Sequence, residues 1–360
     1  MKNSLIKNTT KILKKSVAAL SIAALILPVS GCGNDSAIGE ITVINYGKYI
    51  DPDVLDLFTE ETGIRVNYEE AVTPEELYTK YSAGAIPYDV VCTSDYMLKK
   101  MILEGDFQEI PWDDMEYKDN IGNRYYEFSG TFDPGNKYCV PYFWGTLGIL
   151  YDTAKTGGEI DSWDVLFNGE YAGDIIMQNS MRDSFMVALK YLGYSLNTND
   201  PEEIKEAQQL LLAQKPDVQA YLVDEACDEV VVGNAAMAII YSGEAHMGIE
   251  YNSDLAYVIP KEGSNVWIDC WAITKESEHP EYAAAFLDFL CREDVAMKNF
   301  EYVYYCTPNE KVIENMDEEL RNDEIIMPSD DSLKNCEVCV QVDDDVTGLI
   351  NELWKEIKSE

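Results

Sequence analysis

Three apolar segments alternate with two well-marked helices over residues 41–93, and this order constrains the fold more than any other feature of the chain. The segments typical of buried strands are residues 41–46, 64–68 and 88–93. Asp51 offers a helix N-cap, Pro52 suits the first helical turn and Gly63 ends the apolar stripe, and residues 74–82 predict a second helix. The order βαβαβ predicts parallel strands and therefore an α/β fold.

The rest of the chain continues in this style. Strands are predicted at residues 174–177, 235–241, 255–259 and 266–273, and helices at residues 183–192, 201–214, 281–290 and 349–357. About 330 residues follow the leader, more than one hydrophobic core usually serves, so two lobes are expected. Parallel sheets bind ligands at the carboxyl ends of their strands, which places a candidate site at residues 46–49 and 94–96.

The first 31 residues predict an export signal. Five lysines precede an uncharged apolar core, residues 17–27, that is too short to span a bilayer comfortably. The sequence Val29-Ser-Gly-Cys32 resembles the lipobox of bacterial lipoproteins, and a plain signal peptide is the alternative. In the lipoprotein interpretation Cys32 is lipidated, residues 32–40 are a tether, and acyl chains hold the exported protein at the outer face of the cytoplasmic membrane or in the periplasm.

Charge and residue usage exclude several classes of function. The chain carries a formal charge of −39, and because the leader holds five lysines and no acid, −44 remains for the mature part. Nucleic acid and anionic membrane surfaces are therefore poor partners, whereas a small cation is favoured. With two histidines, and only Cys336 and Cys339 in a C-x-x-C spacing, we expect unpaired thiols, no metal site and no cofactor.

Short motifs occur in a specific order between Ile41 and Lys358. They are Asn45-Tyr-Gly-Lys-Tyr49, Glu61-Thr-Gly-Ile64, Tyr88-Asp-Val-Val91, Val140-Pro-Tyr-Phe-Trp-Gly145, Leu192-Gly-Tyr-Ser195, Asn197-Thr-Asn-Asp-Pro201, Pro260-Lys-Glu-Gly263, Trp267-Ile-Asp269 and Thr307-Pro-Asn309. By their order and spacing, more than by any single motif, the chain resembles the spermidine/putrescine-binding proteins that feed ABC importers.

The resemblance implies a two-lobed α/β fold, the type II periplasmic-binding-protein fold, with a ligand cleft between the lobes and two crossover segments. Lobe 1 would comprise residues 41–145 and 268–312, and lobe 2 residues 146–267 and 313–360. It further implies a monomer that is not an enzyme and that delivers a polyamine to a separate permease and ATPase. The ligand-binding residues carried over by position are Tyr46, Tyr49, Ser94, Tyr96, Ser180, Asp183, Tyr241, Trp267, Asp269 and Tyr305.

These residue types suit a polyamine on chemical grounds alone. Carboxylates give charge-assisted hydrogen bonds to the ammonium groups, and aromatic faces cover the methylenes and add cation–π attraction of roughly 0.5 to 2 kcal/mol per contact. Each residue also has a structural alternative. The aromatic residues could belong to the core, a salt bridge could hold Asp269, and Asp183 could be a helix-start acid favoured by the helix dipole.

Two positions depart from the family pattern. Ser180 stands where the family usually has an acid, and Val340 stands where it usually has a glutamine, although Gln341 is adjacent. Asp95 and Glu244 lie near site positions and could restore the missing charge. The preference between spermidine and putrescine therefore stays open.

Two other functions compete with polyamine binding. The adjacent tyrosines Tyr304 and Tyr305 suggest a binder of ferric ion, or of another small cation, on the same fold. A glycoside hydrolase, which uses paired carboxylates in an aromatic cleft, is an alternative from a different class. With 66 acidic residues, chance pairs of carboxylates are unavoidable, so the hydrolase is the weaker of the two.

Overall fold

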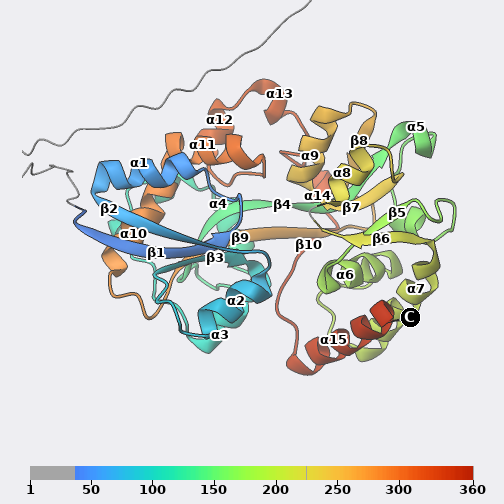
Figure 1. Ribbon diagram of the computed structural model, residues 1–360, viewed down its shortest axis with the longest axis horizontal. Coiled ribbons are helices and arrows are strands. Elements are labelled where there is room, and N and C mark those ends of the chain that lie inside the picture. The colour runs from blue at the N-terminus through green and yellow to red at the C-terminus, as the bar shows by residue number, and fades with distance from the viewer. Residues whose placement is uncertain (1–36, 224, 360) are drawn as a thin grey trace, which may run out of the picture. The chain divides into compact units, whose positions relative to one another are not determined.

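The computed structural model describes residues 37–223 and 225–359, so the predicted signal and Cys32 lie outside the described residues. One mixed sheet runs through the described part, with the strand order β2-β1-β3-β9-β4-β7-β5-β6, while β10 pairs with β9 and β8 with β4 (Figure 1). The strands are β1 (Gly39–Tyr46), β2 (Ile64–Ala71), β3 (Val90–Ser94), β4 (Cys139–Asp152), β5 (Ile175–Gln178), β6 (Val218–Leu222), β7 (Met237–Tyr241), β8 (Leu255–Val258), β9 (Asn265–Ile273) and β10 (Glu337–Val338).

The first three strands confirm the predicted parallel arrangement, because β1 pairs in parallel with both β2 and β3. Helix α1 (Pro52–Thr62) begins after Asp51, whose side chain accepts a hydrogen bond from the Asp53 amide. It ends at Gly63, where a φ of 75° requires the conformational freedom of glycine. Helix α2 (Pro74–Ser82) is also confirmed. Residues 95–104 form helix α3 (Asp95–Glu104), whereas the sequence predicted only that residues 94–96 follow a strand.

Strand β9 makes the sheet mixed, because it lies between β3 and β4 and is antiparallel to both. Strand β4 is long and almost entirely buried. Its first half, residues 139–146, pairs with β9, and its second half, residues 147–152, pairs with β7 and β8. One continuous strand therefore joins the two ends of the sheet.

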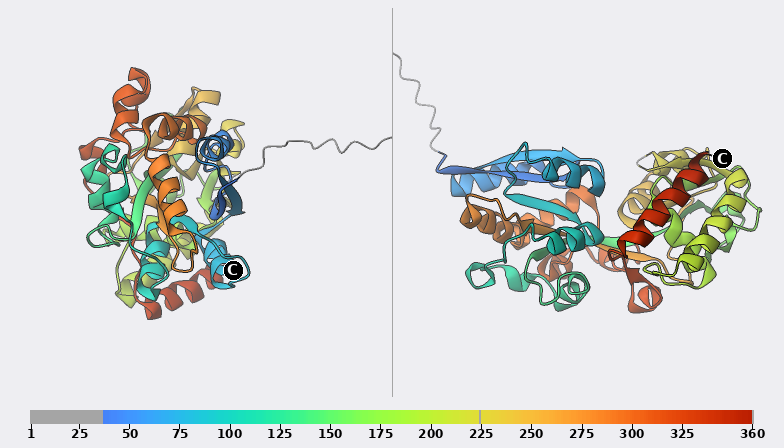
Figure 2. Two further views of the ribbon diagram at one scale, coloured as in Figure 1. Left: turned by 90° about the vertical axis from the view of Figure 1, so that its left-hand side faces the viewer. Right: turned by 90° about the horizontal axis from the view of Figure 1, so that it is seen from below.

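The remaining helices lie around this sheet, with α13 at the periphery (Figures 1 and 2). They are α4 (Asn123–Ser129), α5 (Thr153–Thr156), α6 (Met181–Leu192), α7 (Pro201–Gln214), α8 (Ala226–Val231), α9 (Ser242–Tyr251), α10 (Pro280–Leu290), α11 (Glu293–Val303), α12 (Glu310–Asn315), α13 (Glu318–Arg321), α14 (Asp330–Leu333) and α15 (Asp344–Ser359), with 3-10 turns at Trp112–Asp114, Lys118–Asn120, Trp163–Leu166 and Lys215–Asp217. Within the described residues, none of these helices has both the length and the apolar run that a membrane crossing requires. The eight cysteines of this part are free thiols.

Buried side chains gather in one large cluster around β2, β1, β3 and β9 and in two smaller clusters around β7, β5 and the second half of β4. The C-terminal helix α15 packs with α7 and α6 on the second group (Figure 2). The division into lobes 1 and 2 with the bounds given above stays a prediction. Because Met316 and Ile326 belong to the large cluster, we propose that the last crossing of the chain lies after residue 326.

Candidate functional site

The carboxyl ends of β1 and β3 bring the first candidate residues together. Tyr46 ends β1 and Ser94 ends β3, and β9 places Asp269 directly opposite Ser94. The Tyr46 hydroxyl lies 3.0 Å from the Thr93 Oγ1, so the ring is held against the end of the sheet. Trp267 and Asp269 are two positions apart on β9 and therefore face the same side.

Aromatic rings form a continuous row that starts at the carboxyl ends of β1 and β3. The ring centroids of Tyr46 and Tyr49 are 5.6 Å apart, those of Tyr49 and Tyr305 5.7 Å, those of Tyr305 and Trp267 5.1 Å, and those of Trp267 and Tyr241 6.0 Å. All four contacts are edge-to-face, the arrangement that the ring quadrupoles favour. Tyr241 packs against the large cluster and against one of the two smaller clusters, so the row extends from one cluster to the other.

A buried carboxylate stands at each end of the row. Asp269, near Tyr46 and Tyr49, is 6% exposed, and burial raises the pKa of Asp269 to about 7, an effect that the Tyr49 hydroxyl partly offsets. At the other end Asp183 is 7% exposed and accepts a 2.9 Å hydrogen bond from the Tyr241 hydroxyl. Burial also raises the pKa of Asp183. Among the described residues, neither carboxylate forms an ion pair with a lysine, arginine or histidine.

Several buried polar atoms beside the row lack a hydrogen-bond partner of normal geometry among the described residues. They are the Tyr49 hydroxyl, the Ser94 Oγ, the Asp95 Oδ2 and the Trp267 Nε1. Leaving a buried polar group without a partner costs about 1 to 3 kcal/mol, so these four atoms are candidate contacts for a polar ligand or for water.

Two glycines make room for the rings. A Cβ at Gly145 would lie 2.7 Å from the Trp267 ring and 2.8 Å from the Ser242 Oγ, and a Cβ at Gly243 would collide with the Tyr305 ring. Only glycine allows the rings of Trp267 and Tyr305 to approach β4 and the start of α9 this closely.

The remaining candidates have clear structural positions. Ser180 is the N-cap of α6, and its Oγ accepts a hydrogen bond from the Asp183 amide at 3.3 Å. Asp183 is therefore both an acid in the first turn of α6 and the carboxylate at one end of the aromatic row. The Tyr96 hydroxyl donates to the Glu75 carboxylate at 2.9 Å, and the Tyr96 ring packs against the large cluster and one of the two smaller clusters. Asp95 is 1% exposed, and its Oδ1 accepts from the Tyr96 amide.

Sequence reasoning missed two residues at this place. Arg182 donates to the Val340 carbonyl at 3.1 Å and to the Cys339 Sγ at 2.8 Å, so the C-terminal segment is fastened beside the site through its backbone. The identity of the side chain at Val340 has no part in that bond. Glu75 is the second missed residue, because it lies on α2 and no local pattern relates it to Tyr96.

The two adjacent tyrosines do not converge on one point. Tyr305 contacts Tyr49 and Trp267 in the row. Tyr304 instead stacks on His246, with ring centroids 5.4 Å apart. The arrangement therefore gives no support to a ferric-ion site built on this pair.

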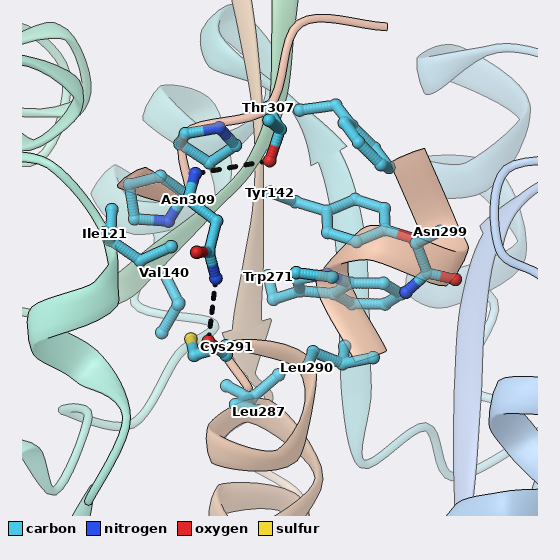
Figure 3. Close-up of a pocket in the computed structure, with 14 residues that line it drawn as sticks. Ile121, Val140, Tyr142, Trp271, Leu287, Leu290, Cys291, Asn299, Thr307 and Asn309 are labelled. Carbon is cyan, nitrogen blue, oxygen red and sulfur yellow. Dashed lines mark hydrogen bonds between the residues drawn. The ribbon is translucent and has the colours of Figure 1, made fainter. Parts of the chain in front are cut away.

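A small apolar cavity lies inside lobe 1, apart from the row (Figure 3). Its volume is about 10 Å3, room for a single water molecule at most. Asn309 beside it donates to the Cys291 carbonyl at 2.8 Å and ties the segment after Thr307 to the end of α10. This cavity is too small for an organic ligand.

Comparison with known proteins identifies relatives along most of the chain. Residues 53–328 match the family model described as bacterial extracellular solute-binding protein. The chain is 34% identical to the spermidine/putrescine-binding periplasmic protein of Escherichia coli (strain K12) over 84% of this chain and 87% of that protein. It is 31% identical to the putrescine-binding periplasmic protein SpuD of Pseudomonas aeruginosa, over 86% and 88% of the two chains.

Two solved structures are similar over almost their whole length. The spermidine/putrescine ABC transporter substrate-binding protein of Streptococcus pneumoniae matches with a TM-score of 0.80 at 37% identity, over 89% of this chain and 99% of that one. A putative spermidine/putrescine ABC transporter from Listeria monocytogenes matches with a TM-score of 0.83 at 35% identity, over 89% and 98%. The two-lobed fold implied by the sequence is thereby confirmed.

Proposed function

Because this chain belongs to the bacterial extracellular solute-binding proteins, we propose that it captures polyamines, spermidine and putrescine among them, and delivers them to an ABC transporter. The observation that carries the proposal is the row of aromatic rings with a buried carboxylate at each end, neither of which is ion-paired with a side chain in the described part of the chain. The ligands in the names of the relatives belong to the same class. The chain is a binding protein and not an enzyme.

The chemistry of the row matches an alkyl diamine in each of its parts. An ammonium group beside Asp269 replaces the water that burial removes from the carboxylate, and it gives the Ser94 Oγ a donor. The second ammonium group meets Asp183, which the Tyr241 hydroxyl already orients. The methylenes between them lie along the rings of Tyr49, Tyr305 and Trp267, where burial and cation–π attraction add to the binding free energy.

The location of the protein follows from its leader. We propose that Cys32 becomes the lipidated first residue and that residues 32–40 tether a monomer to the outer face of the cytoplasmic membrane. A separate permease and ATPase would receive the ligand. Cys32→Ser should release the protein from the membrane fraction, and a variant that stays bound to membranes would contradict the anchor.

Calorimetric titration of the mature protein tests the ligand class. We expect saturable binding of spermidine and putrescine, and none of lysine, ferric citrate or a cello-oligosaccharide. Lysine is the matched control, because it carries an amine on a similar alkyl chain together with a carboxylate that the acidic site repels. Binding of one of the three controls without binding of either polyamine would overturn the proposal.

A further inference from the structure

Glu75, at the start of α2, places a carboxylate at the edge of the candidate site. Its Oε1 accepts a 2.9 Å hydrogen bond from the Tyr96 hydroxyl. Tyr96 is one of the residues that packs against the clusters of both lobes, so this hydrogen bond lies where the lobes meet. Glu75 itself is exposed, and a ligand approaching from solvent can reach it.

Glu75 and its neighbour Glu76, both in the first turn of α2, have different partners. Glu76 forms an ion pair with Lys80 at 2.9 Å and accepts a hydrogen bond from the Val72 amide, so it closes the first turn of α2. Glu75 makes no ion pair with any described cation, and its carboxylate is fixed through Tyr96. A carboxylate held in place without a cation is ready to receive one.

The negative charge of Glu75 also affects Asp183, at the other end of the aromatic row from Asp269. Burial is the main cause of the raised pKa of Asp183, hydrogen bonds from Ser180 and Tyr241 and the charge of Arg182 oppose it, and the negative charge of Glu75 adds a smaller contribution that raises it. The carboxylates of Glu75 and Asp183 therefore interact electrostatically, although they lie on different helices. Asp95 is a poorer candidate for a further ligand carboxylate, because it is almost completely enclosed and its Oδ1 already accepts the Tyr96 amide.

We propose that Glu75 is the third carboxylate of the polyamine site and that it favours triamines over diamines. This inference rests on the proposed function. Asp269 and Asp183 receive the two ammonium groups of a diamine, and a longer triamine has one more ammonium group, which Glu75 meets at the rim beside Tyr96.

The test measures spermidine and putrescine affinities by calorimetry on the wild type and on Glu75→Gln, which keeps the shape of the side chain and removes its charge. We expect spermidine to bind about 3- to 20-fold more weakly to the variant and putrescine to change by less than about twofold. Glu76→Gln is the matched control, because it removes the same charge one residue away and should leave the ratio of the two affinities unchanged. Ser180→Asp added to Glu75→Gln should restore spermidine binding.

Each outcome decides between the alternatives. The inference would be overturned if Glu75→Gln left the ratio of spermidine to putrescine affinity unchanged, or if Glu76→Gln changed that ratio by the same factor. Either result would show that Glu75 acts only through the general electrostatic field of an acidic protein. A wild type that binds neither polyamine would instead overturn the proposed function. Thermal unfolding of each variant establishes that a lost affinity does not come from a lost fold.

Discussion

Ser94 and Asp269 are direct partners in the antiparallel pairing of β3 and β9, although the two strands come from distant parts of the chain. Partners in such a pair direct their side chains to the same face of the sheet. The Ser94 Oγ has no hydrogen-bond partner there among the described residues, and the Asp269 carboxylate has no ion-paired cation. This pair therefore combines a buried carboxylate that has no ion-pair partner with a hydroxyl that can accept a hydrogen bond from a cation.

Asp269→Asn should weaken polyamine binding by a factor of roughly 30 to several thousand. Removing one partner of a desolvated charge pair typically costs about 2 to 5 kcal/mol. Calorimetry with putrescine measures the loss, and Asp95→Asn is the control, since it removes the other nearly inaccessible acid of this region. A change of less than about threefold for Asp269→Asn, with a large loss for Asp95→Asn, would assign the ammonium to Asp95.

Polyamine affinity should rise with pH between pH 6 and pH 8. Burial raises the pKa of Asp269 to about 7, so at pH 6 the ligand must displace a proton from most molecules, whereas at pH 8 the carboxylate is already ionised. Alkylammonium groups stay charged throughout, because their pKa resembles that of lysine, about 10.4. We expect about tenfold weaker binding at pH 6 than at pH 8, with proton release in calorimetry at pH 6. An affinity independent of pH over this range would contradict an ionised anchor.

The ligand-free protein should become more stable when Asp269 is replaced by asparagine. The carboxyl has a pKa of about 7 in the folded protein, against about 3.9 in an unfolded chain, so the folded state binds more protons between these values. Stability therefore falls as pH rises from about 4 to 7, and Asp269→Asn removes this loss. At pH 8 the gain should be on the order of 4 kcal/mol, and at pH 4 close to zero. Urea unfolding at both pH values provides the measurement, and equal gains at both would refute the electrostatic cause.

Trp267→Ala should weaken putrescine binding by about 10- to 100-fold, because the variant loses both the buried ring face and its contacts with Tyr241 and Tyr305. Trp267→Phe keeps a ring and should lose much less. Ligand titration of both variants, with thermal unfolding as the check on folding, distinguishes the two. Similar losses for alanine and phenylalanine would point to the indole Nε1, which has no partner among the described residues, as the important group.

Ser180→Asp should favour spermidine selectively without disturbing α6. Aspartate is as good an N-cap as serine, so the hydrogen bond to the Asp183 amide can be kept. The added carboxylate supplies a stronger, charge-assisted partner for an ammonium group than the hydroxyl does. Dissociation constants for both ligands should show a larger gain for spermidine. An unchanged ratio would mean that a carboxylate at position 180 does not reach the ammonium group that we assign to Glu75.

The local signals at the start of the chain were strong enough to predict β1, α1, β2, α2 and β3. Asp51, Pro52 and Gly63 act within a few residues of themselves, and the structure uses each of them as expected. Strand β4 was visible only as a motif, because Pro141, Gly145 and Gly148 interrupt the pattern of a strand. The structure shows why two of these residues are there: Gly145 makes room for Trp267, and Gly148 lies against Tyr257 and the Val258 carbonyl.

The site could be predicted as a set of residues but not as an arrangement. Resemblance supplied Tyr241 and Asp183, while their hydrogen bond depends on β7 lying beside α6, which no local pattern encodes. The same limit hid Glu75, whose partner Tyr96 stands on another helix. Ser94 was expected in a loop, yet it precedes α3 without capping it through its side chain, and its hydroxyl is left for another partner.

The continuity of β4 sets the mechanics of capture. If the chain passed between the lobes through a flexible loop, the lobes could rotate relative to each other with little change in free energy. Here the same strand is hydrogen-bonded to β9 along residues 139–146 and to β7 and β8 along residues 147–152, so the two ladders meet within one strand. We expect this connection to limit how far the two ends of the sheet move apart. Asp269 and Asp183 should then keep a more constant separation than a loop connection would give them, which favours ligands of matching length.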